Sequence, residues 1–197
     1  MLDIDFGTFP FVTSSNTISA GVCTGLGVSP KLINEVLGVT KAYCTRVGSG
    51  PFPTELEDAT GEELRKLGSE FGATTGRPRR CGWIDLVALK YTCMINGVTK
   101  LVMTKADVLD SFKELNVCTA YDINGKQTDE VPFQISKVKI DPVLKPYAGW
   151  HCDTTQIKNA ADLPVPMSEY IDFINNFVGA PVKYVSNGPG RDQIVQL

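Results

Sequence analysis

The sequence predicts an α/β fold, with an open, mainly parallel sheet flanked by helices and an added β-hairpin. Helical and strand-like patterns alternate along the 197 residues. Two apolar runs, at 100–104 and 181–185, end in the polar segments TKAD and SNGP. Loops at the carboxyl ends of strands are where open α/β sheets bind ligands. No internal repeat or linker divides the chain, so we expect one unit over residues 1–197.

Local signals place the elements that precede the first of these apolar runs. The glycine-rich stretch 21–27 is interpreted as a flexible turn, and Ser-Pro after it opens a predicted helix over 30–37. An apolar, β-branched run predicts a strand over 40–47. A capping-box pattern begins a helix over 60–68, and an aspartate stands at the cap position of another over 84–95.

The second half of the sequence continues the alternation. Two strand-like runs within 117–133 flank an Asn-Gly pair, which predicts a hairpin with a type I′ turn. The proline- and aromatic-rich segment 141–163 is predicted to be an irregular loop. Apolar residues then recur at helical spacing over 166–178, which predicts a helix with one face in the core.

Composition bounds the class of protein. With 43% hydrophobic residues the chain can bury a sizeable core. A net charge of -3 and a pI near 5.2 disfavour nucleic acid and anionic membrane surfaces as partners. No apolar run is long enough to span a membrane and the first residues are acidic, so we expect a cytoplasmic protein. Six dispersed cysteines indicate reduced, mostly buried thiols and no metal site.

The segment FGATTGRPRRCGW at 71–83 is the strongest candidate for a binding loop. Arg77, Arg79 and Arg80 carry planar guanidinium groups that can grip a carboxylate or phosphate through paired hydrogen bonds. The glycines allow a tight turn and a close approach to a ligand. The alternative is a solvated basic loop whose arginines pair with acids of the same chain.

Two further segments carry polar groups suited to ligands. In TKAD, Asp107 could accept hydrogen bonds from the ring N–H and amino group of guanine while the stem of Lys105 lies along the base. Taken alone, this segment also fits a strand end followed by a helix cap. The hydroxyl-rich opening block 3–17 can bind a ligand, but it suits turns equally well.

Taken in order, DIDFGTFPFVTSSNT, KAYCTRVGSGPFP, FGATTGRPRRCGW, TKADVLD and SNGPG closely resemble adenylosuccinate synthetase, over essentially the whole chain. The resemblance implies a P-loop NTPase-like fold and a ligase of AMP biosynthesis. Such an enzyme joins IMP to L-aspartate with hydrolysis of GTP in the presence of Mg²⁺, and its full-length form is a homodimer.

The resemblance also implies roles for individual residues. The implied IMP contacts are Thr13, Val47 and Arg77, and the implied aspartate loop is Ala73, Thr74, Thr75, Gly76, Arg77, Pro78 and Arg79. The implied GTP contacts are Arg79, Lys105, Ala106, Asp107, Ser186, Asn187 and Gly188. No catalytic residue of the family is matched, although Arg77 and Arg79 could offset charge on the departing phosphate.

Two departures from the family pattern shape the expected function. Pro78 stands where many relatives carry a basic residue, which stiffens the loop and removes an amide donor. The family's phosphate loop, its catalytic aspartate and the histidine that acts as an acid have no match in this sequence. The lone His151 is interpreted as structural.

We therefore expect the C-terminal half of a synthetase, inactive without an N-terminal half that supplies the Mg²⁺ ligands. A truncated chain and one component of a split enzyme both fit. The alternatives are a non-catalytic guanine-nucleotide or IMP-binding module and, disfavoured by the missing phosphate loop, a generic GTPase. We also expect an exposed, unpaired sheet edge that promotes self-association.

Overall fold

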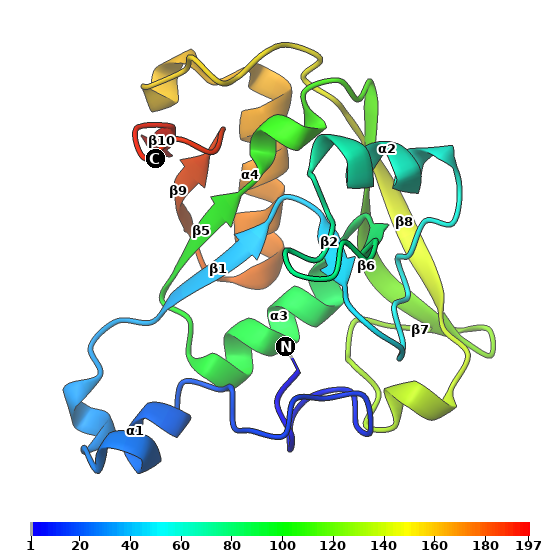
Figure 1. Cartoon of the computed structure of the whole chain (residues 1–197), viewed down its shortest axis with the longest axis vertical. Helices are drawn as coiled ribbons and strands as arrows, with labels where there is room; N and C mark the ends of the chain where they lie inside the picture. The colour runs from blue at the N-terminus through cyan, green and yellow to red at the C-terminus, as the bar shows by residue number, and fades with distance from the viewer. Residues whose placement is uncertain (1) are drawn as a thin grey trace.

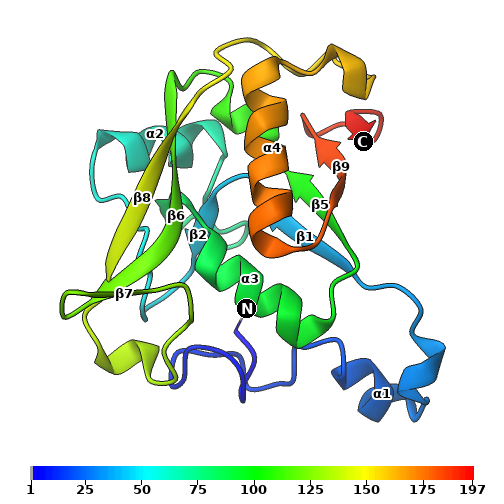
Figure 2. The same ribbon diagram turned by 180° about the vertical axis from the view of Figure 1, so that it is seen from behind.

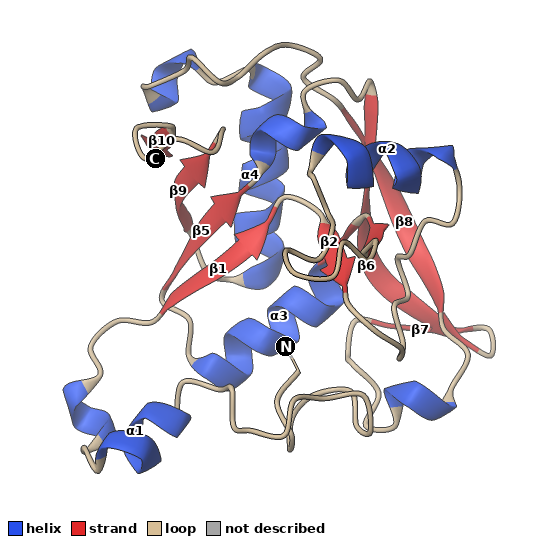
Figure 3. Cartoon of the chain, viewed as in Figure 1, coloured by secondary structure: helices blue, strands red, loops and turns tan. Residues whose placement is uncertain are grey.

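The computed structural model describes residues 2–197, and its strands lie in two four-stranded sheets and one short ribbon (Figures 1 and 3). The first sheet contains β1 (Leu37–Lys41), β5 (Lys100–Thr104), β9 (Val182–Ser186) and β10 (Ile194–Gln196), in that order. β1 and β9 run parallel to β5, while β10 is antiparallel to β9. The predicted α/β class and the predicted strands at 100–104 and 181–185 are confirmed.

One face of this sheet is covered by the helices α3 (Leu86–Asn96) and α4 (Val165–Val178), as Figure 2 shows from behind. Leu101, Met103 and Val185 are fully buried in one core with Met167 and Ile174 of α4. Burying each such side chain contributes about 1.5–3 kcal/mol. The predicted helix over 166–178, with an apolar stripe in the core, is therefore confirmed.

The opposite face of the sheet carries no helix in the part of the chain that the structure describes (Figures 1 and 2). β1 forms the edge, and its Leu37 and Val39 side chains are 51% and 71% exposed. Parallel sheets are normally covered on both faces, because their strands are apolar on both sides. The expected exposed edge is present, and an apolar face accompanies it.

The second sheet is built around the long strand β6 (Glu114–Ile123). Its other strands are β4 (Ile84–Asp85), which is parallel to β6, and β7 (Lys126–Thr128) and β8 (Asp141–Ala148), which are antiparallel to it. Asn124 and Gly125 both have positive φ, 56° and 80°, as a type I′ turn requires. The predicted hairpin forms, although its second strand ends at Thr128 rather than residue 133.

The prediction of an irregular loop over 141–163 was wrong for its first part, because β8 pairs along most of β6. Pro142 and Pro146, which argued against a strand, lie opposite Tyr121 and Asn116. β8 pairs with β6 alone, and an edge strand tolerates prolines because one side of it needs no N–H donors.

The region before β5 also differs from the prediction. The glycine-rich stretch forms a short helix, α1 (Gly21–Leu26), which ends at Gly27 with φ 67°, whereas the expected helix over 30–37 is reduced to the 3-10 turn η1 (Pro30–Leu32). The chain becomes extended after this turn because Val36 exchanges hydrogen bonds with Thr99. Tertiary pairing thus overrides the local helical pattern.

The predicted strand over 40–47 is divided between two sheets. β1 ends at Lys41, Ala42 and Tyr43 turn into the core, and β2 (Cys44–Arg46) pairs antiparallel with β3 (Arg80–Gly82) in the ribbon. The opening block forms turns rather than a strand. The buried carboxylate of Asp3 holds these turns by accepting backbone N–H groups of Asp5, Phe6, Thr17 and Ile18.

The two helices that flank the arginine loop have aspartate caps. α2 (Ala59–Leu67) is capped by Asp58, whose carboxylate accepts the Gly61 N–H at 3.1 Å, so the predicted capping box, which would have placed the cap at residue 60, was wrong. The predicted cap of α3 is confirmed, because Asp85 accepts the Ala88 N–H at 3.0 Å. The other short turns are η2 (Ala106–Leu109), η3 (Ile135–Lys137) and η4 (Ala160–Asp162).

All six cysteines are free, and Cys81, Cys93 and Cys118 are buried. Within residues 2–197, no helix combines the length and apolarity needed to cross a bilayer.

We expect Val39→Lys to reduce self-association of the chain, because a charge on the open edge opposes strand pairing between copies. Thermal stability should change little, since the side chain is largely exposed. Light scattering across a concentration series measures the effect, with Val22→Lys on the exposed surface of α1 as the matched control. Equal self-association of the two variants would contradict the assignment of self-association to the β1 edge.

Candidate functional site

Three parallel strands of the first sheet end side by side. Lys41, the last residue of β1, lies opposite Thr104, the last residue of β5, and the Thr104 hydroxyl donates to the Thr40 carbonyl at 3.1 Å. Met103 in turn lies opposite Val185 of β9, so Ser186 follows at the same end. The TKAD and SNGP segments therefore both emerge at the carboxyl end of the parallel strands of this sheet (Figure 1).

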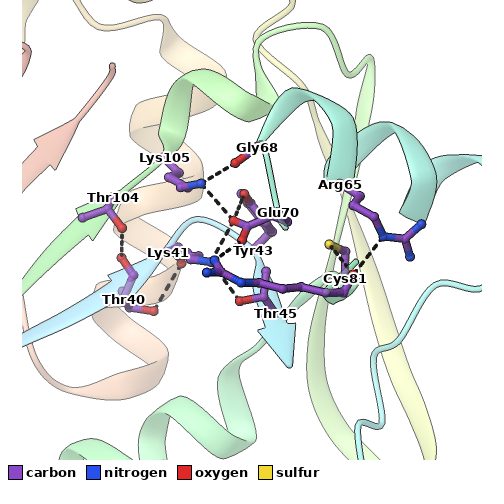
Figure 4. A network of polar contacts seen from close by, with 11 residues as sticks. Thr40, Lys41, Tyr43, Thr45, Arg65, Gly68, Glu70, Cys81, Thr104 and Lys105 are labelled. Carbon is purple, nitrogen blue, oxygen red and sulfur yellow. Dashed lines mark hydrogen bonds and ion pairs between the residues drawn. The ribbon is translucent and has the colours of Figure 1, made fainter. Parts of the chain in front are cut away.

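Beside these strand ends, one buried carboxylate gathers the basic residues (Figure 4). Oε1 of Glu70 accepts hydrogen bonds from Lys41 at 2.7 Å, Tyr43 at 2.6 Å and Lys105 at 3.0 Å. Its Oε2 accepts one from Arg79 at 2.7 Å. The Glu70 side chain is 0% exposed, whereas those of Lys41, Arg79 and Lys105 are 25%, 32% and 36% exposed.

The electrostatics of this Glu70 cluster keep the carboxylate ionised. Burial by itself raises the pKa of Glu70, but the hydrogen bonds from Lys41, Tyr43, Lys105 and Arg79 outweigh it and lower the pKa to about 2. Burial, together with the negative carboxylate, raises the pKa of Tyr43 well above its ordinary range. At neutral pH the cluster therefore holds three cations against one directly contacting anion.

The TKAD segment is fixed by this cluster. Lys105 has φ 59°, in the left-handed region that residues with a Cβ seldom adopt. Its ammonium group donates to the Gly68 carbonyl as well as to Glu70. Gly68 caps the carboxyl end of α2, where the helix dipole favours a positive charge.

The two aspartates that follow Lys105 have different environments. Asp107 lies in the first turn of η2, is half-buried, and has its pKa raised by burial. Asp110 instead accepts hydrogen bonds from Trp150 Nε1 at 2.7 Å and the Thr154 N–H at 2.8 Å, so its role is structural.

The arginine loop divides into an exposed tip and an anchored base. Residues 72–77 are largely exposed, and Gly76, at φ 64°, makes the turn that its N–H closes on the Gly72 carbonyl at 2.8 Å. Arg77 lies on this tip and makes no ion pair within residues 2–197. Its guanidinium group is available to an external carboxylate or phosphate.

The other two arginines of the loop bind acids of the chain itself. Arg80 makes a paired contact with Glu55, at 2.7 Å for one of the two bonds, and donates to the Gly50 carbonyl at 2.9 Å. Arg79 is tied to Glu70 through one nitrogen, while its buried Nε has no partner within residues 2–197. The alternative of internally paired arginines thus describes Arg80 fully and Arg79 in part.

Val47 lies on a cavity of about 710 Å³, lined mainly by apolar groups and including Arg46, Phe52 and Tyr91. Arg46 donates to the Thr8 hydroxyl at 3.1 Å, and so joins the opening block to this wall. Thr13 is exposed and is not part of the lining. The structure therefore does not bring Thr13 and Val47 together on the walls of this cavity.

The SNGP segment is held by its own chain. Ser186 Oγ donates to the Gly188 carbonyl at 3.0 Å. Asn187 is fully buried and its Nδ2 donates to the carbonyls of Thr154 and Ile157, while its Oδ1 has no partner within residues 2–197. The side chain of Asn187 therefore fixes the loop, and a ligand would meet the backbone around it.

Sequence reasoning missed Glu70, Lys41 and Tyr43. Lys41 and Tyr43 stand in the KAYCTRVG segment, but neither side chain forms a recognised pattern by itself. Glu70 immediately precedes a loop with three arginines and is the nearest acid in sequence to it. That proximity was the available signal, and it indicates an ion pair but does not identify its partners.

Comparison with known proteins fits this geometry. A family model described as adenylosuccinate synthetase matches residues 1–195. The chain belongs to the adenylosuccinate synthetase family. The resemblance carried by the five sequence segments is thereby confirmed.

Individual relatives agree with the assignment. The chain is 57% identical over 195 residues to adenylosuccinate synthetase of Parabacteroides distasonis and 56% identical to that of Christiangramia forsetii, covering 99% of this chain and 46% of each relative. It spans about half the length of the curated relatives that it matches.

Solved structures give the same result. A fully ligated adenylosuccinate synthetase from Plasmodium falciparum superposes with a TM-score of 0.94 at 39% identity, over 100% of this chain and 47% of that chain. Succinoaminodeoxyadenylate synthetase of cyanophage S-2L, at 17% identity and a TM-score of 0.58 over 99% of this chain and 43% of its own, agrees in fold alone.

The pH dependence of stability provides a test of the Glu70 cluster. Because its folded-state pKa is depressed to about 2 from an ordinary value of 4.5, the stabilisation from ionised Glu70 is complete above 4.5 and is lost as the pH falls toward 2. We expect the difference in unfolding free energy between the unmodified chain and Glu70→Gln to shrink across that window. Urea denaturation at a series of pH values measures it.

The control for this titration is Glu169→Gln, which removes an exposed carboxylate on α4. Its unfolding free energy should follow that of the unmodified chain throughout the same pH window. A difference for Glu70→Gln that stays constant down to the acid limit would mean that the fold does not lower the pKa of Glu70.

Proposed function

We propose that residues 1–197 form the C-terminal half of an adenylosuccinate synthetase. In this reaction IMP, L-aspartate and GTP give adenylosuccinate, GDP and phosphate, in the cytoplasmic synthesis of AMP. The observation that carries the proposal is the convergence of the arginine loop, TKAD and SNGP at one end of three parallel strands. We infer that the chain supplies substrate recognition and is inactive alone.

Guanine recognition is assigned to the TKAD segment. The half-buried Asp107 carboxylate would accept hydrogen bonds from the ring N–H and amino group of guanine, with the Lys105 stem along the base and the backbone of Ala106 beside it. Adenine offers no such pair of donors and would leave the carboxylate unpaired. The segment Ser186, Asn187 and Gly188 would close over the base from the neighbouring strand end.

Aspartate binding is assigned to the tip of the arginine loop, residues 73–79. Its exposed hydroxyls of Thr74 and Thr75 and the unpaired Arg77 can hold the two carboxylates of L-aspartate and leave the amine free. Pro78 limits the backbone freedom of the loop. Arg79, anchored through one nitrogen only, can face the GTP phosphates from the same strand end.

The proposed chemistry is attack of the aspartate amine on the purine carbon whose oxygen GTP has phosphorylated. A carbon–nitrogen bond forms, the carbon–oxygen bond to phosphate breaks, and the amine loses a proton. Arg77 and Arg79 would offset the charge on the departing phosphate. IMP would contact Arg77, Thr13 and Val47, with the cavity at Val47 suited to an aromatic or ribose moiety.

The buried carboxylate of the candidate site does not fit Mg²⁺. Mg²⁺ is usually held by one or two carboxylates together with substrate phosphates and waters, and both oxygens of Glu70 already accept hydrogen bonds from cations and a hydroxyl. No cluster of acidic, histidine or cysteine ligands occurs within residues 2–197. We therefore assign the metal ligands and the phosphate loop to the N-terminal half of a complete synthetase.

The uncovered face and edge of the first sheet support this division. Val39 and Leu37 expose apolar surface where a parallel sheet is normally covered. We propose that the N-terminal half packs against β1 and that the completed enzyme is a homodimer. The relatives have the required length, because this chain matches only 46% of them.

Asp107→Ala tests guanine recognition. We expect it to weaken GDP binding by at least about a hundredfold and to abolish the preference for GDP over ADP, because each hydrogen bond to a charged group contributes about 1.5–3 kcal/mol. Calorimetric titration of the chain with both nucleotides measures the change, with the exposed α4 variant Asp172→Ala as control. Equal affinity of the unmodified chain for GDP and ADP would remove the assignment.

Reconstitution tests the whole proposal. The chain alone should give no adenylosuccinate from IMP, L-aspartate, GTP and Mg²⁺, as followed by absorbance. A chimera that joins the remaining part of the Parabacteroides distasonis synthetase to this chain should turn over, since the relative is 57% identical across the joined region. Turnover by the chain alone would refute the half-enzyme proposal, and an inactive chimera would favour a non-catalytic binding module.

A further inference from the structure

We propose that Glu70 is a positioning residue that sets the aspartate-binding and guanine-binding sides of the site together, through Arg79 and Lys105. This inference rests on the proposed function, which assigns those two residues to the substrates. Glu70 itself is fully buried, so it acts through the residues that it holds and not by touching a substrate.

The contacts of Glu70 join three separate segments of the chain. Lys41 ends β1, Arg79 lies at the base of the arginine loop and Lys105 follows β5, and all three donate to this one carboxylate. Because three cations would otherwise repel one another, the carboxylate determines how closely they can approach. The Tyr43 hydroxyl also donates to Oε1 of Glu70, and this bond fixes the orientation of the carboxylate.

Each basic side chain is held within the chain through part of its donors and remains partly exposed. Arg79 contacts Glu70 through Nη1 alone, and its side chain is 32% exposed. Lys105 is 36% exposed and contacts Glu70 and the Gly68 carbonyl. A partly exposed cation that is already positioned through part of its donors is pre-organised for an anionic or polar ligand.

On the aspartate side, Glu70 closes the base of the arginine loop. The Arg79 N–H donates to the Glu70 carbonyl at 2.9 Å while its side chain contacts the Glu70 carboxylate. Above this closure, the Gly72 N–H donates to the Arg77 carbonyl at 2.9 Å. Removal of the carboxylate would leave these backbone bonds in place and remove the side-chain contact that holds Arg79, at the base of the loop that presents Thr74, Thr75 and Arg77.

On the guanine side, Glu70 maintains an unusual backbone. Lys105 keeps its left-handed conformation while its ammonium group is held by Glu70 and Gly68. Asp107 follows two residues later and depends on that turn for its place in η2. If Lys105 relaxes, Asp107 moves with it.

The test is Glu70→Gln in the chimera with the Parabacteroides distasonis N-terminal part. We expect the KM for L-aspartate and the KM for GTP each to rise roughly tenfold, with a smaller fall in kcat, because an ionic hydrogen-bond partner has been replaced by a neutral one. A residue with a merely structural role would lower stability without raising these two KM values together.

The matched control is Glu55→Gln. Glu55 binds Arg80, the residue after Arg79, and is itself mostly buried, with 18% side-chain exposure, but among the described residues it contacts neither Arg79 nor Lys105. We expect both KM values to stay within about twofold of the unmodified chimera. Equal effects of the two variants, or a rise in only one KM for Glu70→Gln, would overturn the inference.

A milder variant keeps the test decisive if Glu70→Gln does not fold. Tyr43→Phe removes one donor to Oε1 and keeps all three cations, so both KM values should rise together by about two- to threefold. Unchanged KM values would overturn the inference. Failure of the unmodified chimera to turn over would instead remove the proposed function, and is thus distinguishable from failure of the Glu70 proposal.

Discussion

Because β1, β5 and β9 run parallel, the segments that follow them emerge at the same end of the sheet. The register fixes the order in which they meet, with Lys41 beside Thr104 and Met103 beside Val185. That pairing depends on the core beneath it, where Leu101, Met103 and Val185 pack against α4. A further buried bond, from the Tyr170 hydroxyl of α4 to the Ala42 carbonyl at 2.8 Å, holds the chain where it leaves β1.

Glu70 solves an electrostatic problem created by this topology. Basic residues from two of these strand ends and from the arginine loop meet here in a partly buried space. One ionised carboxylate offsets their repulsion from the buried side. Glu55 forms a salt bridge with Arg80 in a similar manner, with Arg46 close enough to interact with both charges.

The predictability of the fold follows the range of the interactions involved. The strand at 100–104, the helix α4, the Asp85 cap and the Asn-Gly turn depend on local patterns, and each is confirmed. The expected helix over 30–37 and the expected loop over 141–163 were wrong because pairing with distant strands decides both segments. Neither pairing can be recognised from the residues of the segment itself.

The same distinction holds for the candidate site. Lys105 and Asp107 could be placed because they follow a recognisable buried strand, and the structure brings Lys105 and Arg79 to one cluster. Thr13 and Val47 were grouped by resemblance, yet they do not share the walls of one cavity. The role of Glu70 as the common acceptor for three cations could not be predicted, because these cations lie in segments that are far apart in the sequence.

The internal contacts of the site distinguish what this chain forms by itself from what it leaves open. The TKAD, SNGP and arginine-loop bases are held by Glu70, Gly68, Asn187 and Arg65, all within the described chain. These recognition segments therefore need no additional polypeptide to define their anchors. The exposed face at Val39 is different, because nothing within residues 2–197 covers it. If further polypeptide covers this sheet, as proposed above, it can do so without rebuilding the loops, because the loops are already anchored.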